Sequence, residues 1–266
     1  WSFTANWQDI VSGLAWGLGY FGMPHIIVRF MSLESQKEIK KSAIIGISWT
    51  TIICFFAIVI GVVGRMFLGF DENINKNSLV FISMVRNIFP ALMSGVLLSA
   101  ILAASMSTAD SQLLAAGSAF ASDVYKPVFR NGKASDKEMT WMSRFVVLAI
   151  ALAAMFIALS PNSGSIMSLV SNAWGVFGAA FGPAIMLSLF WKRFNFAGAI
   201  TGIVVGSVVD VAWLMYLSST GIYELLPGYV AGMLAAYVVA LVTAAPSQEG
   251  VDKFEIAEHK ALAGED

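Results

Sequence analysis

The chain has 266 residues, of which 58% are hydrophobic and only 12% are charged, and its formal net charge at pH 7 is −1. Soluble domains carry about 25% charged residues, so this composition argues against a soluble enzyme and indicates a polytopic membrane protein. The near-zero charge gives no sign of nucleic-acid binding, and the single cysteine, Cys54, excludes an internal disulfide and argues against a metal cluster.

Seven apolar segments are long enough to cross the ~30 Å hydrocarbon core of a bilayer, which needs about 20 helical residues. They span residues 8–28, 43–68, 91–122, 140–160, 165–190, 197–218 and 226–245. Between the second and third, Asn77–Phe89 has apolar residues at helical spacing, which predicts a short amphipathic helix at the membrane surface. We therefore expect one all-α membrane domain, residues 1–245, followed by a polar tail, 246–266, that is mobile or weakly helical.

The basic residues predict how the segments cross the membrane. Thirteen of the sixteen Lys and Arg residues lie in one alternating set of loops, and the opposite set holds only Arg65, Lys76 and Arg86. Cytoplasmic loops carry the excess of basic residues, so the N-terminus is predicted outside and the C-terminal tail inside. The chain begins at Trp1 without a basic signal peptide, and we expect it to be a fragment of a longer protein.

The first segment contains several helix-weakening residues. Gly13, Gly17, Gly19, Gly22 and Pro24 interrupt an otherwise apolar span, and each glycine weakens a helix by roughly 1 kcal/mol and a proline by ~3 kcal/mol. Broken helices near the bilayer midplane bind substrate in secondary transporters. The spacing places Trp16 and Tyr20 on one helix face, where they would form an aromatic wall. Packing glycines with interfacial aromatic residues are the alternative.

The third segment carries polar side chains deep in an apolar span. Ala104, Ser107, Thr108 and Ser111 share one helix face, and Asp110 lies beside them. A carboxylate at the bilayer centre costs at least ~2.5–3.5 kcal/mol, so such a residue suggests a functional site. Hydroxyl oxygens suit a small hard cation such as sodium. Small-residue packing, with the hydroxyls bonded back to the preceding helical turn, is the alternative.

The later segments are rich in glycine. Gly175, Gly178 and Gly182 allow the fifth segment to bend or to pack closely. In the sixth segment glycines spaced four apart predict close helix packing; they are Gly198, Gly202 and Gly206. Asp210 follows in the same segment, and we expect it to face a neighbouring helix or the headgroup region without a chemical role.

Several motifs, in order along residues 7–245, resemble the sodium/solute symporter family, and within it the proline-transporting branch. They are Trp16–His25 with Arg29–Met31, Leu98–Thr108, Asp123–Lys126, Ala173–Pro183 and Tyr223–Gly228. The resemblance implies two inverted five-helix repeats of the leucine-transporter type. The first five segments would then form the second repeat, the last two would be peripheral helices, and the first repeat would be missing from this chain.

The resemblance also implies roles for individual residues. The carbonyl of Ala104 and the hydroxyls of Ser107 and Thr108 match positions that bind sodium, with the remaining ligands supplied by the missing repeat. Asp110 and Ser111 match the neighbourhood of a second sodium site, or Asp110 tunes the first. Substrate contacts are implied for Trp16, Tyr20 and Pro24, and a gate on the external side for Trp174 and Phe177.

The function implied is sodium-coupled symport of L-proline by alternating access, with sodium as the coupling ion, no cofactor and no enzymatic step. Expected partners are L-proline, sodium, the lipid bilayer and the missing N-terminal repeat, in a bacterial inner (plasma) membrane. Met23 stands where the proline branch tends to carry glutamine, so a symporter for pantothenate or another small carboxylate stays open. A membrane sensory input module of a signalling protein is a rival from another class, and a channel subunit is a weaker one.

Overall fold

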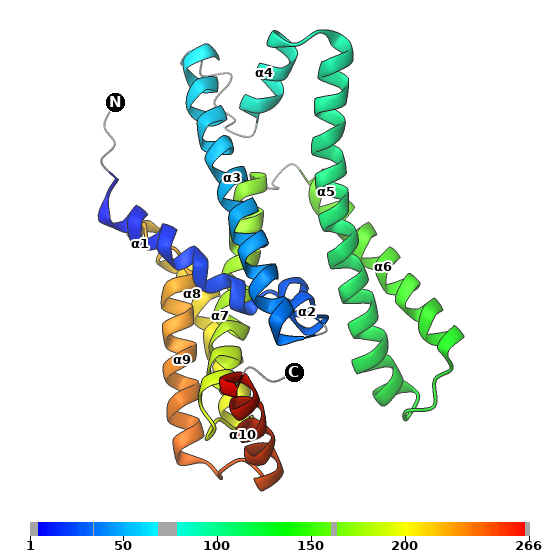
Figure 1. Cartoon of the computed structure of the whole chain (residues 1–266), viewed down its shortest axis with the longest axis vertical. Helices are drawn as coiled ribbons and strands as arrows, with labels where there is room; N and C mark the ends of the chain where they lie inside the picture. The colour runs from blue at the N-terminus through cyan, green and yellow to red at the C-terminus, as the bar shows by residue number, and fades with distance from the viewer. Residues whose placement is uncertain (1–4, 34, 69–78, 161–163, 264–266) are drawn as a thin grey trace. The chain divides into compact units, whose positions relative to one another are not determined.

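A computed structural model describes residues 5–33, 35–68, 79–160 and 164–263, and over these ranges the chain is helical, without strands (Figure 1). The helices are α1 (Trp7–Ala15), η1 (Trp16–Gly22), α2 (Pro24–Met31), α3 (Gln36–Leu68), α4 (Val80–Ile88), α5 (Ala91–Ala119), η4 (Phe120–Phe129), α6 (Asp136–Leu159), α7 (Ile166–Phe190), α8 (Phe196–Tyr216), η5 (Ser218–Thr220), α9 (Leu225–Val242) and α10 (Gln248–Ala263).

The long helices confirm the predicted all-α polytopic membrane protein. Six of them are long and apolar enough to cross a bilayer; they are α3, α5 together with η4, α6, α7, α8 and α9. A seventh crossing is obtained when α1 and η1 are counted with α2, which follows after a bend of 55°. Each predicted segment therefore corresponds to one described span, with boundaries that differ by several residues.

The chain forms two compact units. Trp1–Ile39 and Gly164–Asp266 make up the first unit, and Lys40–Ser163 make up the second, so α3 begins in one and continues into the other. Each unit is described by itself below.

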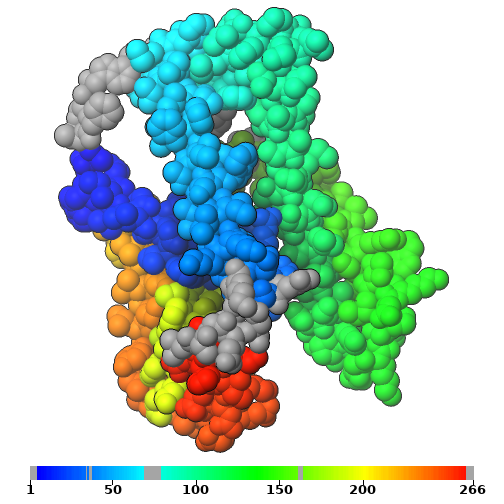
Figure 2. Space-filling view, in the orientation of Figure 1, coloured from blue at the N-terminus to red at the C-terminus, as the bar shows by residue number. Residues whose placement is uncertain are grey.

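The first unit is built on three closely packed helices, α7, α8 and α9, which run side by side (Figure 1). The predicted glycine packing is confirmed: a Cβ at Gly202 would lie 2.8 Å from the Ala236 Cβ, and one at Gly206 would lie 2.1 Å from the Ala179 carbonyl oxygen. The orange α9 adjoins the yellow helices beside it without a gap (Figure 2). Small residues let helix backbones approach in this way and maximise van der Waals contact in lipid.

The predicted polar tail contains one helix. Residues Gln248–Ala263 form α10, in the segment that was predicted to be mobile or weakly helical. Two i,i+4 pairs stabilise it, Glu249 with Lys253 at 2.6 Å and Gln248 with Asp252 at 2.9 Å. Such pairs add a few tenths of a kcal/mol each to helix stability.

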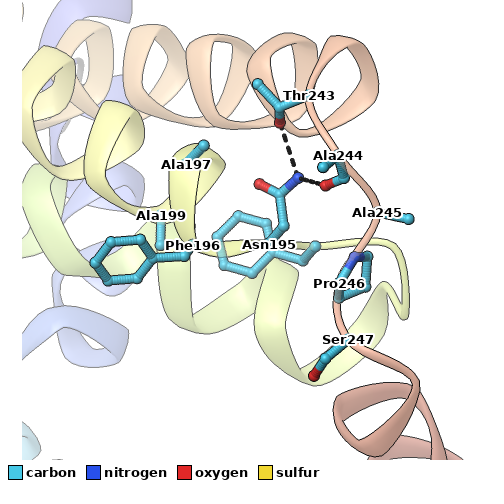
Figure 3. Close-up of a pocket in the computed structure, with 10 residues that line it drawn as sticks. Asn195, Phe196, Ala197, Ala199, Thr243, Ala244, Ala245, Pro246 and Ser247 are labelled. Atoms are coloured by element: carbon cyan, nitrogen blue, oxygen red, sulfur yellow. Dashed lines mark hydrogen bonds between the residues drawn. The ribbon is translucent and has the colours of Figure 1, made fainter.

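A pocket lies where the start of α8 meets the chain after α9 (Figure 3). Asn195 caps α8 by accepting a hydrogen bond from the Gly198 N–H at 2.9 Å. Its side-chain amide donates to the Thr243 hydroxyl at 2.8 Å and to the Ala244 carbonyl at 2.7 Å. One side chain thus fixes the ends of two helices, and we assign this pocket to helix capping rather than to ligand binding.

The second unit contains α4, α5, η4 and α6. The short helix predicted at Asn77–Phe89 is present as Val80–Ile88, and its first two predicted residues lie outside the described ranges. The Ser94 hydroxyl donates to the Val85 carbonyl at 3.0 Å, which joins α4 to the start of α5. At the other end of α5, Tyr125 and Arg130 both contact the Glu138 carboxylate at the beginning of α6. These polar contacts hold the ends of α5, which carries the predicted ion-binding face.

Candidate substrate and ion sites

The first span is broken at the predicted place. The α-helix gives way to the 3₁₀-helix η1 at Trp16, and Met23 is extended, with φ −85° and ψ 112°. Pro24 then occupies the first position of α2, where its missing N–H and fixed φ are no disadvantage. A helix interrupted inside lipid leaves backbone groups that need partners from protein or from a cavity. The break is therefore a place where backbone polar groups are available to a ligand.

Glycines in η1 are needed for its close approach to α7. A Cβ at Gly22 would lie 2.3 Å from the carbonyl oxygen of Phe177 and 2.7 Å from the Cα of Gly178. A Cβ at Gly19 would lie 2.0 Å from the Trp174 Nε1. No real Cβ tolerates such distances, so these two glycines hold the break against α7 rather than merely weakening the helix.

Aromatic rings surround the break on one side. Trp16 stacks on Trp174 with ring centroids 5.8 Å apart and on Tyr223 at 5.4 Å. Tyr20 meets Trp174 edge-on at 4.8 Å. The Trp174 indole N–H also donates to the carbonyl of Trp16 at 3.0 Å, which satisfies a backbone group at the end of α1. Trp16, Trp174, Tyr20 and Tyr223 form what we call the aromatic cluster.

The predicted residues of this region differ in their surroundings. Trp174 contacts both Trp16 and Tyr20, whereas the Phe177 ring stacks on Phe181 at 6.1 Å and is 41% exposed. Pro24 is exposed at the start of α2. The roles of these residues in substrate contact and gating stay predictions.

Sequence reasoning did not select Tyr223 as a site residue. Its hydroxyl donates to the Ser171 carbonyl at 2.6 Å, which fixes its ring against Trp16. Burial and the neighbouring carboxylate of Glu224 raise the pKa of this hydroxyl, so Tyr223 remains a hydrogen-bond donor over the physiological range. The motif Tyr223–Gly228 was visible in the sequence, but nothing in a linear pattern indicated that it meets a residue more than 200 positions earlier.

On α5, one backbone carbonyl accepts hydrogen bonds from two hydroxyl groups. The Ser107 and Thr108 side chains both donate to the Ala104 carbonyl, at 3.0 Å and 3.2 Å. This places three oxygens together on one helix face, the set predicted for sodium. Three other serine hydroxyls on α5 each donate to a separate backbone carbonyl four residues earlier: Ser99 to Gly95, Ser105 to Ile101 and Ser111 to Ser107. Ser107 and Thr108 are thus bonded back to the preceding turn like the other serines of α5, as the packing alternative expects, and differ only in sharing one carbonyl, so their role in sodium binding stays a prediction.

Ser111 and Asp110, the other two residues predicted for the ion site, do not bond to the Ala104 carbonyl. Ser111 donates to the backbone carbonyl of Ser107 at 2.8 Å, so it extends the same face by one turn. Asp110 is exposed within its unit and has no hydrogen bond or ion pair with any described residue. Among the described residues, no group of three His, Cys, Asp or Glu side chains is placed to hold a metal ion.

The apolar spans, the broken first segment and the oxygen-bearing helix define a multi-pass membrane protein with the features of a secondary transporter. The chain belongs to the sodium:solute symporter family, whose sequence model matches residues 3–206.

Its curated relatives include several proline transporters. The chain is 43% identical over 253 residues to the osmoregulated proline transporter OpuE of Bacillus subtilis, covering 94% of this chain and 51% of that protein. It is 43% identical over 246 residues to the high-affinity proline transporter PutP of the same organism (92% and 52%). Identity to sodium/proline symporter 2 of Staphylococcus saprophyticus is 42% over 248 residues (89% and 48%). The chain thus spans about half the length of these relatives, and no solved structure matches it.

Proposed function

We propose that this chain is the C-terminal half of a sodium-coupled symporter for L-proline. The observation that carries the proposal is the glycine- and proline-broken first span, whose break is lined by the aromatic cluster. The relatives named as proline transporters or sodium/proline symporters support the same substrate and the same ion. In this proposal the first five spans form one five-helix repeat, and the other repeat lies in the missing half.

Proline chemistry fits a broken helix beside aromatic rings. Proline is a zwitterion with an apolar ring, so its ring would pack on Trp16 and Tyr20 while its charged groups reach backbone N–H and C=O groups near Met23 and Pro24. Helix ends at a break present such unpaired backbone groups. Trp174 orients Trp16 through stacking and through the hydrogen bond to its carbonyl. We assign Trp174 to the gate on this basis and Phe177 to a lesser part.

Sodium would be bound on α5 by the carbonyl of Ala104 and the hydroxyls of Ser107 and Thr108. These are neutral oxygen ligands, and the first repeat would complete the coordination. We place Ser111 and Asp110 beside this site, where a carboxylate would strengthen the field felt by the ion. One charge moving through 100 mV releases about 2.3 kcal/mol, which supports roughly 50-fold accumulation of the substrate.

We further propose that the N-terminus of this chain lies outside the cell and α10 inside, from the distribution of basic residues along the loops. The membrane domain would then be residues 1–245 and the cytoplasmic tail 246–266. A carrier of pantothenate or another small carboxylate is the second candidate, because Met23 departs from the proline branch at the break itself.

Uptake by the full-length transporter in proteoliposomes tests this proposal. We expect labelled L-proline to accumulate under an inward sodium gradient and to stop accumulating when choline replaces sodium. Unlabelled proline should compete, while pantothenate and other amino acids should not. Uptake that is indifferent to sodium would refute the coupling, and stronger competition by pantothenate would favour the second candidate. The C-terminal half alone should transport nothing.

Replacing Trp174 by phenylalanine should weaken proline binding while leaving the sodium requirement unchanged. The variant keeps a ring beside Trp16 but loses the N–H donated to the Trp16 carbonyl. Loss of one neutral hydrogen bond costs about 0.5–1.5 kcal/mol, which corresponds to a rise in the KM for proline of roughly 2- to 10-fold. Trp141→Phe in α6 is the matched control, because Trp141 is 61% exposed and outside the cluster. An equal KM in the two variants would contradict the role of Trp174.

A further inference from the structure

Two carboxyl side chains lie inside the first unit, next to the aromatic cluster. Asp210, on α8, is fully buried with 0% exposure, and Glu224, just before α9, is 8% exposed. Neither oxygen of Asp210 has a hydrogen-bond partner among the described residues. The sequence left two positions open for Asp210, a neighbouring helix or the headgroup region, and the structure shows the first; its complete burial without partners among the described residues was not foreseen.

The two carboxyl groups converge on one point of α7. A Cβ at Gly175 would lie 2.9 Å from Oδ1 of Asp210 and 3.5 Å from Oε1 of Glu224. On the other side, a Cβ at Gly228 in α9 would lie 2.9 Å from the Cβ of Asp210. Glycine on both flanking helices thus leaves room for the aspartate, and a side chain at either glycine would contact it.

Over the described ranges, no basic side chain is paired with these two carboxyl groups. No described Lys, Arg or His forms an ion pair with Asp210 or Glu224. From α7 the aspartate is faced by Gly175 and from α9 by Gly228. The titratable groups facing it are Glu224 and Tyr223, and the Tyr223 hydroxyl already donates to Ser171. A buried carboxylate without a partner is far more costly than the neutral acid.

We propose that the Asp210–Glu224 pair is a proton-binding site, with the proton held on Asp210, and that this proton keeps α7, α8 and α9 packed together. A sodium ion needs several oxygen ligands, whereas Asp210 is enclosed by glycines and neither of its oxygens has a hydrogen-bond partner in the part of the chain that the structure describes. A proton needs only one oxygen and no additional space. Asp210 and Glu224 adjoin the aromatic cluster through Tyr223 and Gly175, but neither is among the residues proposed above to bind sodium or proline.

The proposal makes folding stability depend on pH in a defined direction. A carboxyl group in an unfolded chain is ionised at neutral pH, so the folded protein binds one proton more than the unfolded protein. Stability then falls as pH rises through the range in which the unfolded chain has lost this proton and the folded protein still holds it, and it levels off once the folded protein releases the proton. Asparagine matches the shape of a neutral aspartic acid and cannot release a proton, so Asp210→Asn should remove this dependence.

Thermal unfolding of the purified full-length transporter, in sodium-free buffer from about pH 5 to about pH 9, tests the site without relying on transport. We expect the melting temperature of the unmodified protein to fall with rising pH and most of that fall to disappear in Asp210→Asn. Glu258→Gln, an exposed acid on α10, is the matched control and should keep the full pH dependence. An unchanged pH profile in Asp210→Asn would overturn the proposal.

A second variant keeps the test decisive if Asp210→Asn does not fold. Glu224→Gln removes the neighbouring carboxylate that repels a charge on Asp210, so the fall in melting temperature should move to lower pH. An unmoved profile in Glu224→Gln would overturn the proposal. Repeating the titration of the unmodified protein with added sodium distinguishes the ligand. If a sodium-dependent rise in melting temperature is lost in Asp210→Asn or Glu224→Gln, the pair binds sodium and the proton assignment is wrong.

Discussion

Replacing Ser107 and Thr108 together by alanine should raise the sodium concentration needed for half-maximal proline uptake by about tenfold or more. Their hydroxyls meet at the carbonyl of Ala104, so the double variant removes two of the three oxygens that this chain offers the ion. A hydrogen bond or ligand to a charged group contributes about 1.5–3 kcal/mol, and each 1.4 kcal/mol is a factor of about ten. Uptake by the full-length transporter, measured against sodium concentration, checks this expectation.

Ser105→Ala is the control for the ion site. Ser105 lies on the same helix, is bonded back to Ile101 at 3.0 Å and points to a different face from Ser107. Its replacement removes a hydroxyl of the same kind from the same membrane depth and should leave the sodium curve unchanged. If Ser105→Ala shifts the curve as much as the double variant, loss of helix packing rather than of ion ligands explains the effect.

Gly22→Ala should abolish correct folding around the break and lower the yield of functional transporter severely. The added Cβ would meet the carbonyl oxygen of Phe177 at 2.3 Å and the Cα of Gly178 at 2.7 Å, and both are backbone atoms that cannot rotate away. Overpacking a tight contact costs about 1–3 kcal/mol, and more where backbone must move. Size-exclusion profiles and melting temperatures of the purified full-length protein provide the measurement.

Gly17→Ala supplies the matched comparison. Gly17 belongs to the same 3₁₀-helix, and a Cβ there would have no atom within 4 Å. Alanine also favours helical backbone over glycine, so this variant should fold as well as the unmodified protein. Should both variants behave alike, the close approach of η1 to α7 would not be what requires glycine at position 22.

The parts of the fold set by local chemistry could be predicted from the sequence. Glycines and Pro24 in an apolar span predicted the break, because each removes helix stability at its own position. Glycines spaced four apart on α8 predicted a packing face, and Ala179 and Ala236 fill the opposite side of it. The clustering of Ser107 and Thr108 on one carbonyl also follows from helical spacing alone.

Contacts between distant segments were beyond the same reasoning. The stacking of Trp16 on Trp174 and Tyr223 depends on how each helix is rotated about its axis and on how far it is shifted along the membrane normal. Neither quantity can be read from the local sequence pattern. Asp210 illustrates the same limit, because one acid in an apolar helix is compatible with a lipid headgroup, a neighbour or a buried site. Its depth became evident only when Gly175 and Gly228 were seen to enclose it.

The hydrogen bond from Trp174 to the carbonyl of Trp16 joins residues 158 positions apart in the chain. It supplies the broken span with a partner that an intact helix would have found within itself. A shift of η1 relative to α7 would break this hydrogen bond, at a cost of about 0.5–1.5 kcal/mol, unless α7 moved with it. In the transport cycle proposed above, this bond favours movement of the break together with α7, and we expect the bending to occur where no such bond joins two helices.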